Sequence, residues 1–157
     1  MAHHLRRQLA NSAILFLNYE NCVVEAGEDI SSEIRQTAQT LSREMKDVFS
    51  RISEHLALAG ENPLATIEDL IQHAALKRCP NRISLDALWF FPSSNSIHAI
   101  DEISCAIEDL LPASKDQASL QLLSSVLKTH LDHAWCLRRL AVSAGRSPLK
   151  TFSDEPY

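Results

Sequence analysis

The stretch ISSEIRQTAQTLSREMKDVFSRISEHLALAG, from Ile30 to Gly60, carries apolar residues at steps of four and three. This spacing is typical of an amphipathic helix with one apolar face. The apolar positions are Ile30, Ile34, Ala38, Leu41, Met45, Val48, Ile52, Leu56 and Ala59. At about 1.5 Å per residue the helix would be roughly 45 Å long, so it needs partners of similar length packed along it.

The composition agrees with one helical domain that spans residues 1–157. Hydrophobic residues make up 45% of the chain and charged residues 22%, which suffices for one substantial core. The chain has only three glycines, Gly27, Gly60 and Gly145, and each follows an expected helix. So few glycines leave little scope for the tight turns of a β-sheet protein.

Three further long helices are expected. Apolar residues between 5 and 26 form a stripe wide enough for two buried faces, one against the bundle core and one against a neighbouring subunit, although a single deep core would also explain it. Ser96 is expected to cap a helix that ends near Leu111, and Ser114 with Gln117 forms a capping box for a last helix that continues to Leu140.

The connection between the second and third long helices is expected to be a crossover from about 61 to 96. It carries a short helix near 67–76, preceded by a cap at Thr66, and an apolar segment around Trp89. Two hairpins joined by such a connection predict an all-α, ferritin-like four-helix bundle with a long crossover carrying a short helix between helices 2 and 3. The tail from about 145 to 157 is expected to be loose.

Charge and cysteine content narrow the class of protein. The net charge of −5 argues against nucleic-acid binding by the chain as a whole. The four cysteines show no metal-binding spacing and are interpreted as reduced thiols, and no apolar run is long enough to span a membrane. The expected location is the cytoplasm, without membrane association.

The last helix resembles the closing helix of the Dps mini-ferritins in its run SLQLLSSVLKTHLDHAWCLRRL. The matching positions are Asp116, Ser119, Leu122, Leu123, Leu127, His130, Ala134, Trp135, Leu137 and Arg138. The segment ISEHLALAGENPLAT, from Ile52 to Thr66, also looks like the end of the family's second helix and the capped helix after it. The resemblance implies a homo-oligomer, a dodecamer built from dimers, that binds and stores iron, oxidises it at sites shared between two subunits and protects against oxidative stress.

The ligands that the resemblance implies are mostly replaced. Aligned on Glu54, the positions of the family's second-helix ligands read Arg35, Gln39 and Ser50, so only Glu54 is retained. The first-helix ligand is either Glu20 or Cys22, depending on the alignment, and we take Glu20 with Glu54 as the candidate iron ligands because carboxylates suit hard cations. No catalytic residue is assigned, and whether the chain is an enzyme stays open.

Two functional interpretations follow from the resemblance. The first is an iron-binding and iron-storing protein with a degenerate ferroxidase site, and the alternative is a non-catalytic oligomeric shell, scaffold or partner-binding protein. DNA binding through terminal basic residues such as Arg6 and Arg7 is considered but not favoured. His130 is interpreted as a packing residue and His133 as a solvent-facing one, and Trp135 is expected in a core or an interface.

Overall fold

The computed structural model describes residues 1–25, 32–64, 66–77, 85–111 and 116–143, without the side chains of 25, 85–93 and 143. Within these residues the helices are α1 (Ala2–Glu25), α2 (Ser32–Leu58), α3 (Ile67–His73), α4 (Leu85–Leu110) and α5 (Gln117–Ser143). No strand occurs in the described part of the chain. The predicted all-α fold, with four long helices and one short helix in the crossover, is confirmed.

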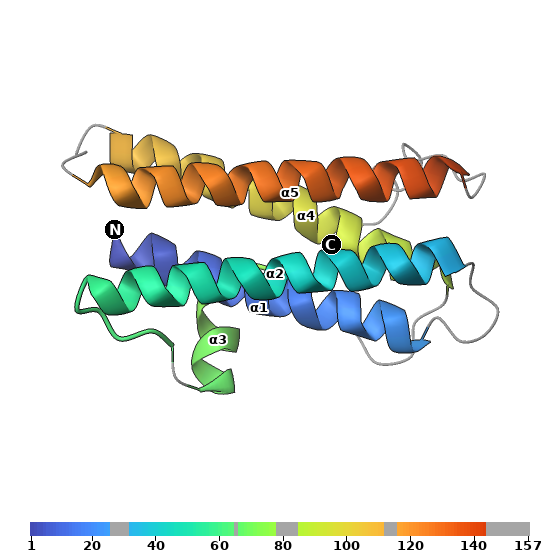
Figure 1. Ribbon diagram of the computed structural model, residues 1–157, viewed down its shortest axis with the longest axis horizontal. Coiled ribbons are helices and arrows are strands. Elements are labelled where there is room, and N and C mark those ends of the chain that lie inside the picture. Colours follow the sequence, from blue (N-terminus) through green and yellow to red (C-terminus); the bar gives the residue numbers. More distant parts are fainter. Residues whose placement is uncertain (26–31, 65, 78–84, 112–115, 144–157) are drawn as a thin grey trace, which may run out of the picture.

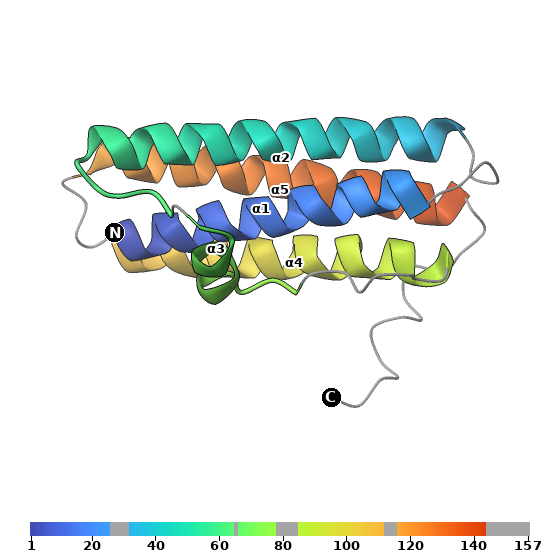
Figure 2. The same ribbon diagram turned by 90° about the horizontal axis from the view of Figure 1, so that it is seen from below.

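The long helices form two antiparallel hairpins. Helix α1 packs along α2 and α4 packs along α5, while contacts between α1 and α4 and between α2 and α5 join the pairs (Figure 1). The short helix α3 lies outside the bundle against α1 (Figure 2). No described helix has the length and apolarity needed to cross a lipid bilayer.

Helix α2 supplies the predicted apolar stripe to the core. Every stripe position from Ala38 to Leu56 is buried, as the three-and-four spacing requires. The helix ends at Leu58, and Gly60 adopts a positive φ of 73° that lets the amide of Glu61 donate to the carbonyl of Leu56 at 2.9 Å. Ala59 is therefore exposed in the closing turn, and its predicted burial is wrong.

The second buried face of α1 is covered by the crossover of the same chain. The side-chain oxygen of Asn11 accepts hydrogen bonds from the amides of Ala75 and Leu76, at 2.9 and 3.3 Å. The carbonyl of Lys77 accepts from the amides of Asn18 on α1 and Asn95 on α4, at 3.2 and 2.8 Å. These bonds satisfy backbone amides and a carbonyl of residues 75–77, which lack regular secondary structure. Because this segment covers α1, the wide apolar stripe of α1 does not require a neighbouring subunit.

Helix α4 begins earlier than the sequence suggests. Its first residue is Leu85, eleven positions before Ser96, so the prediction that Ser96 caps this helix is wrong and the crossover ends before residue 96. Pro92 lies within the helix. A proline removes one helical hydrogen bond, but a helix held by packing can continue through it. Ser96 is buried and turns its hydroxyl toward α1.

Of the two caps predicted for α3 and α5, the one at α3 is confirmed and the one at α5 lies outside the described residues. At α3, the Thr66 hydroxyl accepts from the Asp69 amide at 3.1 Å and the Asp69 carboxylate accepts from the Thr66 amide at 3.2 Å, which confirms the capping box. At α5, Asp116 accepts from the Ser119 amide at 3.0 Å, while the predicted cap Ser114 lies outside the described residues. Gly27, Gly145 and the tail from 145 also lie outside them.

Candidate functional site

The outer surface of the α1–α2 hairpin carries the two predicted iron ligands, Glu20 and Glu54. Glu20 is exposed on α1 and accepts a hydrogen bond from the hydroxyl of Ser42 on α2. Glu54 is exposed near the end of α2, twelve positions after Ser42, which corresponds to about 18 Å along the helix. The two carboxylates of one chain therefore do not share a site.

The remaining positions implied by the family resemblance lie on the same helix, and we call Arg35, Gln39, Ser50 and Glu54 the outer α2 face. Arg35 has no acceptor atom, Gln39 offers a neutral amide, and the Ser50 hydroxyl donates to the Lys46 carbonyl at 3.1 Å. Among the described residues, no group of three or more His, Cys, Asp or Glu side chains could hold a metal ion. Cys22, the alternative first-helix ligand, is half-buried on α1.

A second polar site lies inside the bundle and was not predicted as a unit. The side chains of Tyr19, Ser96, His130 and His133 are all buried, and we call them the buried polar centre. The Tyr19 hydroxyl lies 3.3 Å from Ser96 Oγ and 3.2 Å from His133 Nδ1. His133 Nε2 lies 2.7 Å from a carboxylate oxygen of Glu44, whose side chain is half-exposed on α2. All four long helices thus contribute to one hydrogen-bonded line.

The prediction that His133 faces solvent is wrong, because only 1% of this residue is exposed. His133 and His130 are three positions apart on α5, so both point to the side of the helix that meets the rest of the bundle. Their rings are roughly perpendicular, with centroids 6.3 Å apart. His130 is fully buried, as expected, yet neither of its ring nitrogens has a hydrogen-bond partner among the described residues.

Burial sets the protonation of the buried polar centre. It lowers the pKa of His130 to about 3, and the neighbouring His133 contributes in the same direction. Burial also lowers the pKa of His133, although the hydrogen bond and charge of Glu44 oppose this. The pKa of the Tyr19 hydroxyl is raised well above its usual range, chiefly by burial. Both imidazoles and the phenol are therefore neutral near pH 7.

This protonation state fixes the direction of the hydrogen bonds. A neutral imidazole donates from one nitrogen and accepts at the other. Since the Glu44 carboxylate accepts, His133 Nε2 carries the proton and His133 Nδ1 accepts the hydrogen bond of the Tyr19 hydroxyl. The Tyr19 oxygen then accepts from Ser96. Every bond in the line consequently points from the bundle interior toward Glu44.

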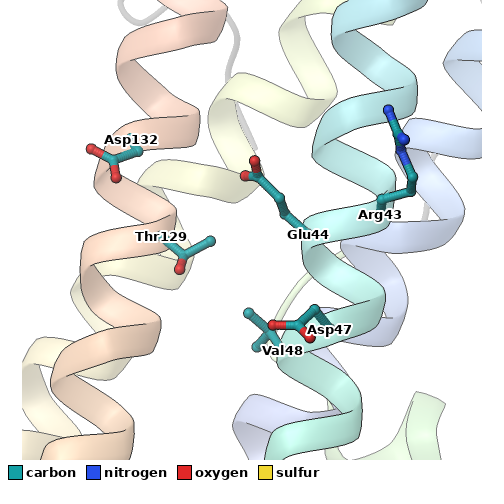
Figure 3. Close-up of a pocket in the computed structure, with 6 residues that line it drawn as sticks. All are labelled: Arg43, Glu44, Asp47, Val48, Thr129 and Asp132. Carbon is teal, nitrogen blue, oxygen red and sulfur yellow. The ribbon is translucent and has the colours of Figure 1, made fainter.

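Glu44 connects the buried polar centre to a groove between α2 and α5. The groove has a volume of about 420 Å³. It is lined by Arg43, Glu44, Asp47, Val48, Thr129 and Asp132, and Figure 3 shows Glu44 and Thr129 directed into the space between the two helices. Water in this groove can reach the carboxylate that ends the hydrogen-bonded line.

The N-terminal arginines are held in ion pairs. Arg6 contacts Glu61 at 2.7 Å and Arg7 contacts Glu102 at 3.1 Å. Helix α1 begins at Ala2, so these residues lie on a packed helix rather than on a free arm. The pairing reduces the positive charge available to phosphates near this end of the chain.

Trp135 is not part of the core of the chain, since 61% of the residue is exposed. The guanidinium of Arg139 stacks on its ring at 4.8 Å from the centroid. The predicted place of Trp135 in the core is therefore wrong, and its predicted place in an interface stays a prediction.

Comparison with known proteins identifies the fold. No family model and no curated protein matches the sequence. Dps from Thermosynechococcus elongatus has a similar structure, with a TM-score of 0.81 at 16% identity, over 98% of this chain and 94% of that one. Dps from Listeria monocytogenes gives 0.81 at 18% identity, over 95% and 96%. The chain has the Dps mini-ferritin fold.

The structure is also similar to that of a dodecameric thioferritin, the bacterioferritin-related protein from Bacteroides fragilis. Its TM-score is 0.83 at 12% identity, over 92% of this chain and 85% of that one. At identities this low, structural similarity establishes the fold but not the function. The chemistry must be inferred from the residues of this chain. Those residues form two separate polar regions, the outer α2 face with Glu20 and the buried polar centre.

Proposed function

We propose that this Dps-like chain binds and stores iron as a homo-oligomer, protects against oxidative damage, and has an altered ferroxidase site. The main support is the match to Dps structures over nearly the whole chain, including the crossover and α3. A match of that extent favours the family's mode of assembly as well as its helix bundle. In this proposal iron is the cargo of the protein and not a resident cofactor.

The iron ligands that we propose are Glu20 and Glu54. Within one chain Glu54 lies about 18 Å along α2 from Ser42, the residue that Glu20 contacts, so a shared site needs a second subunit. The resemblance to Dps implies sites between two subunits, which would combine Glu20 or Cys22 of one chain with Glu54 of its partner. Both glutamates are exposed in the single chain and are therefore open to such pairing.

The assembly is tested by multi-angle light scattering after size-exclusion chromatography. Twelve chains of 17.5 kDa would give a species of about 210 kDa. A monomer would contradict the proposed shell and with it the shared iron site.

Iron binding is tested by adding ferrous iron without oxygen and then one equivalent of hydrogen peroxide. We expect a protein-bound ferric absorbance that falls strongly in Glu54→Gln. Glu108→Gln, which neutralises an exposed glutamate on α4, serves as the matched control and is expected to behave as the native protein. Equal ferric signals in the two variants would contradict the role of Glu54.

A second candidate, a non-catalytic shell or scaffold, is favoured by the outer α2 face. Arg35, Gln39 and Ser50 stand where the resemblance implies ligands. The variant Arg35→His, Gln39→Asp, Ser50→Asp restores imidazole and carboxylate groups to these positions. A native protein without iron oxidation, together with a triple variant that gains it, would support the non-catalytic candidate. Iron oxidation by the native protein would support the first one.

We expect the protein in the cytoplasm and do not favour DNA binding. The described cysteines Cys22, Cys105 and Cys136 are free, which suits a reducing compartment. The ion pairs of Arg6 and Arg7 weigh against phosphate contacts. Gel-shift titration at low salt tests this, and tight binding that weakens steeply with added salt would contradict it.

A further inference from the structure

The hydrogen-bonded line from Tyr19 to Glu44 runs from the bundle interior to the solvent-exposed groove. Its two links measure 3.2 Å, from the Tyr19 hydroxyl to His133 Nδ1, and 2.7 Å, from His133 Nε2 to Glu44. Tyr19 and His133 are each only 1% exposed, whereas Glu44 lines the groove between α2 and α5. The only solvent-facing member of the line is therefore its acceptor end.

A tyrosine in this setting is easier to oxidise than an isolated buried phenol. Removal of one electron makes the phenol strongly acidic, so the oxidation is favourable only where the proton can leave as well. His133 Nδ1 is a hydrogen-bonded base directly at the phenolic oxygen, and its other nitrogen already donates to a carboxylate. A proton can thus leave Tyr19 without a charge being left inside the bundle.

We propose that Tyr19 is a redox-active residue that gives one electron to a radical oxidant derived from peroxide, such as the hydroxyl radical, while its proton leaves through His133 to Glu44. The Tyr19 O–H bond breaks, the electron reduces the hydroxyl radical to hydroxide, and the proton moves to His133 Nδ1. The proton on His133 Nε2 moves to the Glu44 carboxylate and from there to water in the groove. The product at Tyr19 is a neutral phenoxyl radical, so electrons and protons balance.

The surroundings of Tyr19 suit this role. Ser96 donates to the phenolic oxygen and holds the ring in register with His133. The T-shaped contact between the Tyr19 and His133 rings, with centroids 5.6 Å apart, keeps the two groups in place. His130 has a pKa lowered to about 3 by burial, so it stays neutral and does not compete for the proton.

The first experiment asks whether Tyr19 forms a radical at all. Tyr19 and Tyr157 are the only tyrosines, so Tyr157→Phe leaves a single candidate. The intact chain carrying this substitution is exposed to photochemically generated sulfate radical, without iron, and is frozen for electron paramagnetic resonance. We expect a tyrosyl signal that narrows when ring-deuterated tyrosine is incorporated and that disappears on the further change Tyr19→Phe.

The second experiment asks whether the proton leaves through Glu44. Glu44→Gln keeps an oxygen that accepts from His133 Nε2 but cannot take up the proton. We expect the Tyr19 radical to form about tenfold or more slowly in this variant. In the protein that retains Glu44, we expect the radical to form more slowly in D₂O than in H₂O. Asp47→Asn, one helical turn away in the same groove, loses the same charge and is the matched control.

Absence of a tyrosyl signal in the Tyr157→Phe protein would overturn the proposal. Equal rates in Glu44→Gln and Asp47→Asn would overturn the proton route through Glu44. Thermal unfolding followed by circular dichroism checks that each variant is folded. If Tyr19→Phe fails to fold, the ring-deuterated sample still assigns the radical, because it needs no change at Tyr19.

Discussion

The buried polar centre and the outer α2 face differ in how their members depend on one another. Inside the bundle, the Tyr19 hydroxyl meets Ser96 and His133, and His133 also meets Glu44, so residues of four helices share one arrangement. On the outer α2 face, the Ser50 hydroxyl donates to a carbonyl of its own helix and Glu54 is exposed. We therefore expect replacement of an outer residue to leave the fold intact, and replacement of an interior one to disturb several helices.

This difference explains how a chain can keep the Dps fold while its implied ligand positions change. Met45, Val48 and Ile52 fix the inner side of α2 in the core. Arg35, Gln39 and Ser50 lie on the same helix but outside that core. Fold and surface chemistry are therefore encoded by different faces of one helix.

The largest effect is expected from the apolar part of the interior. Leu123→Ala removes a fully buried side chain of α5 and should lower the free energy of unfolding by about 2–5 kcal/mol through lost burial and a new cavity. Leu58→Ala is the control, because 88% of Leu58 is exposed, and should have little effect. Urea titration measures both, and similar losses would contradict the assignment of the core.

A smaller loss is expected from the buried polar centre. Tyr19→Phe removes the hydroxyl and leaves Ser96 and His133 Nδ1 without their partner, at a cost of about 1–3 kcal/mol. Ser104→Ala is the control, since among the described residues its hydroxyl bonds only to the Ile100 carbonyl of its own helix. If chemical denaturation gave the same value for both variants, the hydrogen-bonded line would not contribute to stability.

The interior should also make stability depend on pH. His130 has a pKa of about 3 when folded and about 6.5 when unfolded. Between these values the unfolded chain binds a proton that the folded chain does not, so stability falls as the pH falls from about 6.5. The contribution is up to about 1.4 kcal/mol per pH unit, measured by urea titration from pH 7 to 4. A slope unchanged by His130→Leu would refute it.

At pH 7 the same substitution should stabilise the protein. His130→Leu replaces an imidazole that has no hydrogen-bond partner among the described residues by an apolar side chain, with an expected gain of about 1 kcal/mol. Calorimetry should therefore detect a higher melting temperature. A loss of stability would indicate that the His130 ring makes an interaction that an apolar side chain cannot replace.

The smallest effect is expected on the outer α2 face. Gln39→Ala and Glu54→Gln change exposed residues and should alter the free energy of unfolding by no more than about 0.5 kcal/mol. Urea titration of the two variants side by side provides the measurement. A loss comparable to that of Tyr19→Phe would remove the contrast between the two regions.

The sequence predicted what depends on local periodicity and missed what depends on tertiary contacts. The stripe from Ala38 to Leu56 and the cap at Thr66 follow from spacing within single helices. The burial of His133 could not be read in this way, because its partner Tyr19 is 114 positions away along the chain. Two polar residues one turn apart, His130 and His133, were the only local sign of the buried polar centre.

The start of α4 was missed for a related reason. Ser96 was interpreted as the cap and the end of the crossover, but the helix starts at Leu85 and continues through Pro92, since a long packed helix tolerates the loss of one helical hydrogen bond. Glu20 and Glu54 were found through family resemblance rather than from local pattern, and their role as ligands stays a prediction. Their separation within one chain was not visible before the helices were placed.

The hydrogen bonds accepted by the Lys77 carbonyl indicate an order of folding. This one oxygen accepts from Asn18 of the first hairpin and from Asn95 of the second, so both bonds exist only when the hairpins are together. Each hairpin closes over a short loop, whereas joining them closes a much longer one and is entropically slower. The two bonds to the Lys77 carbonyl should therefore form late in folding, after each hairpin has closed.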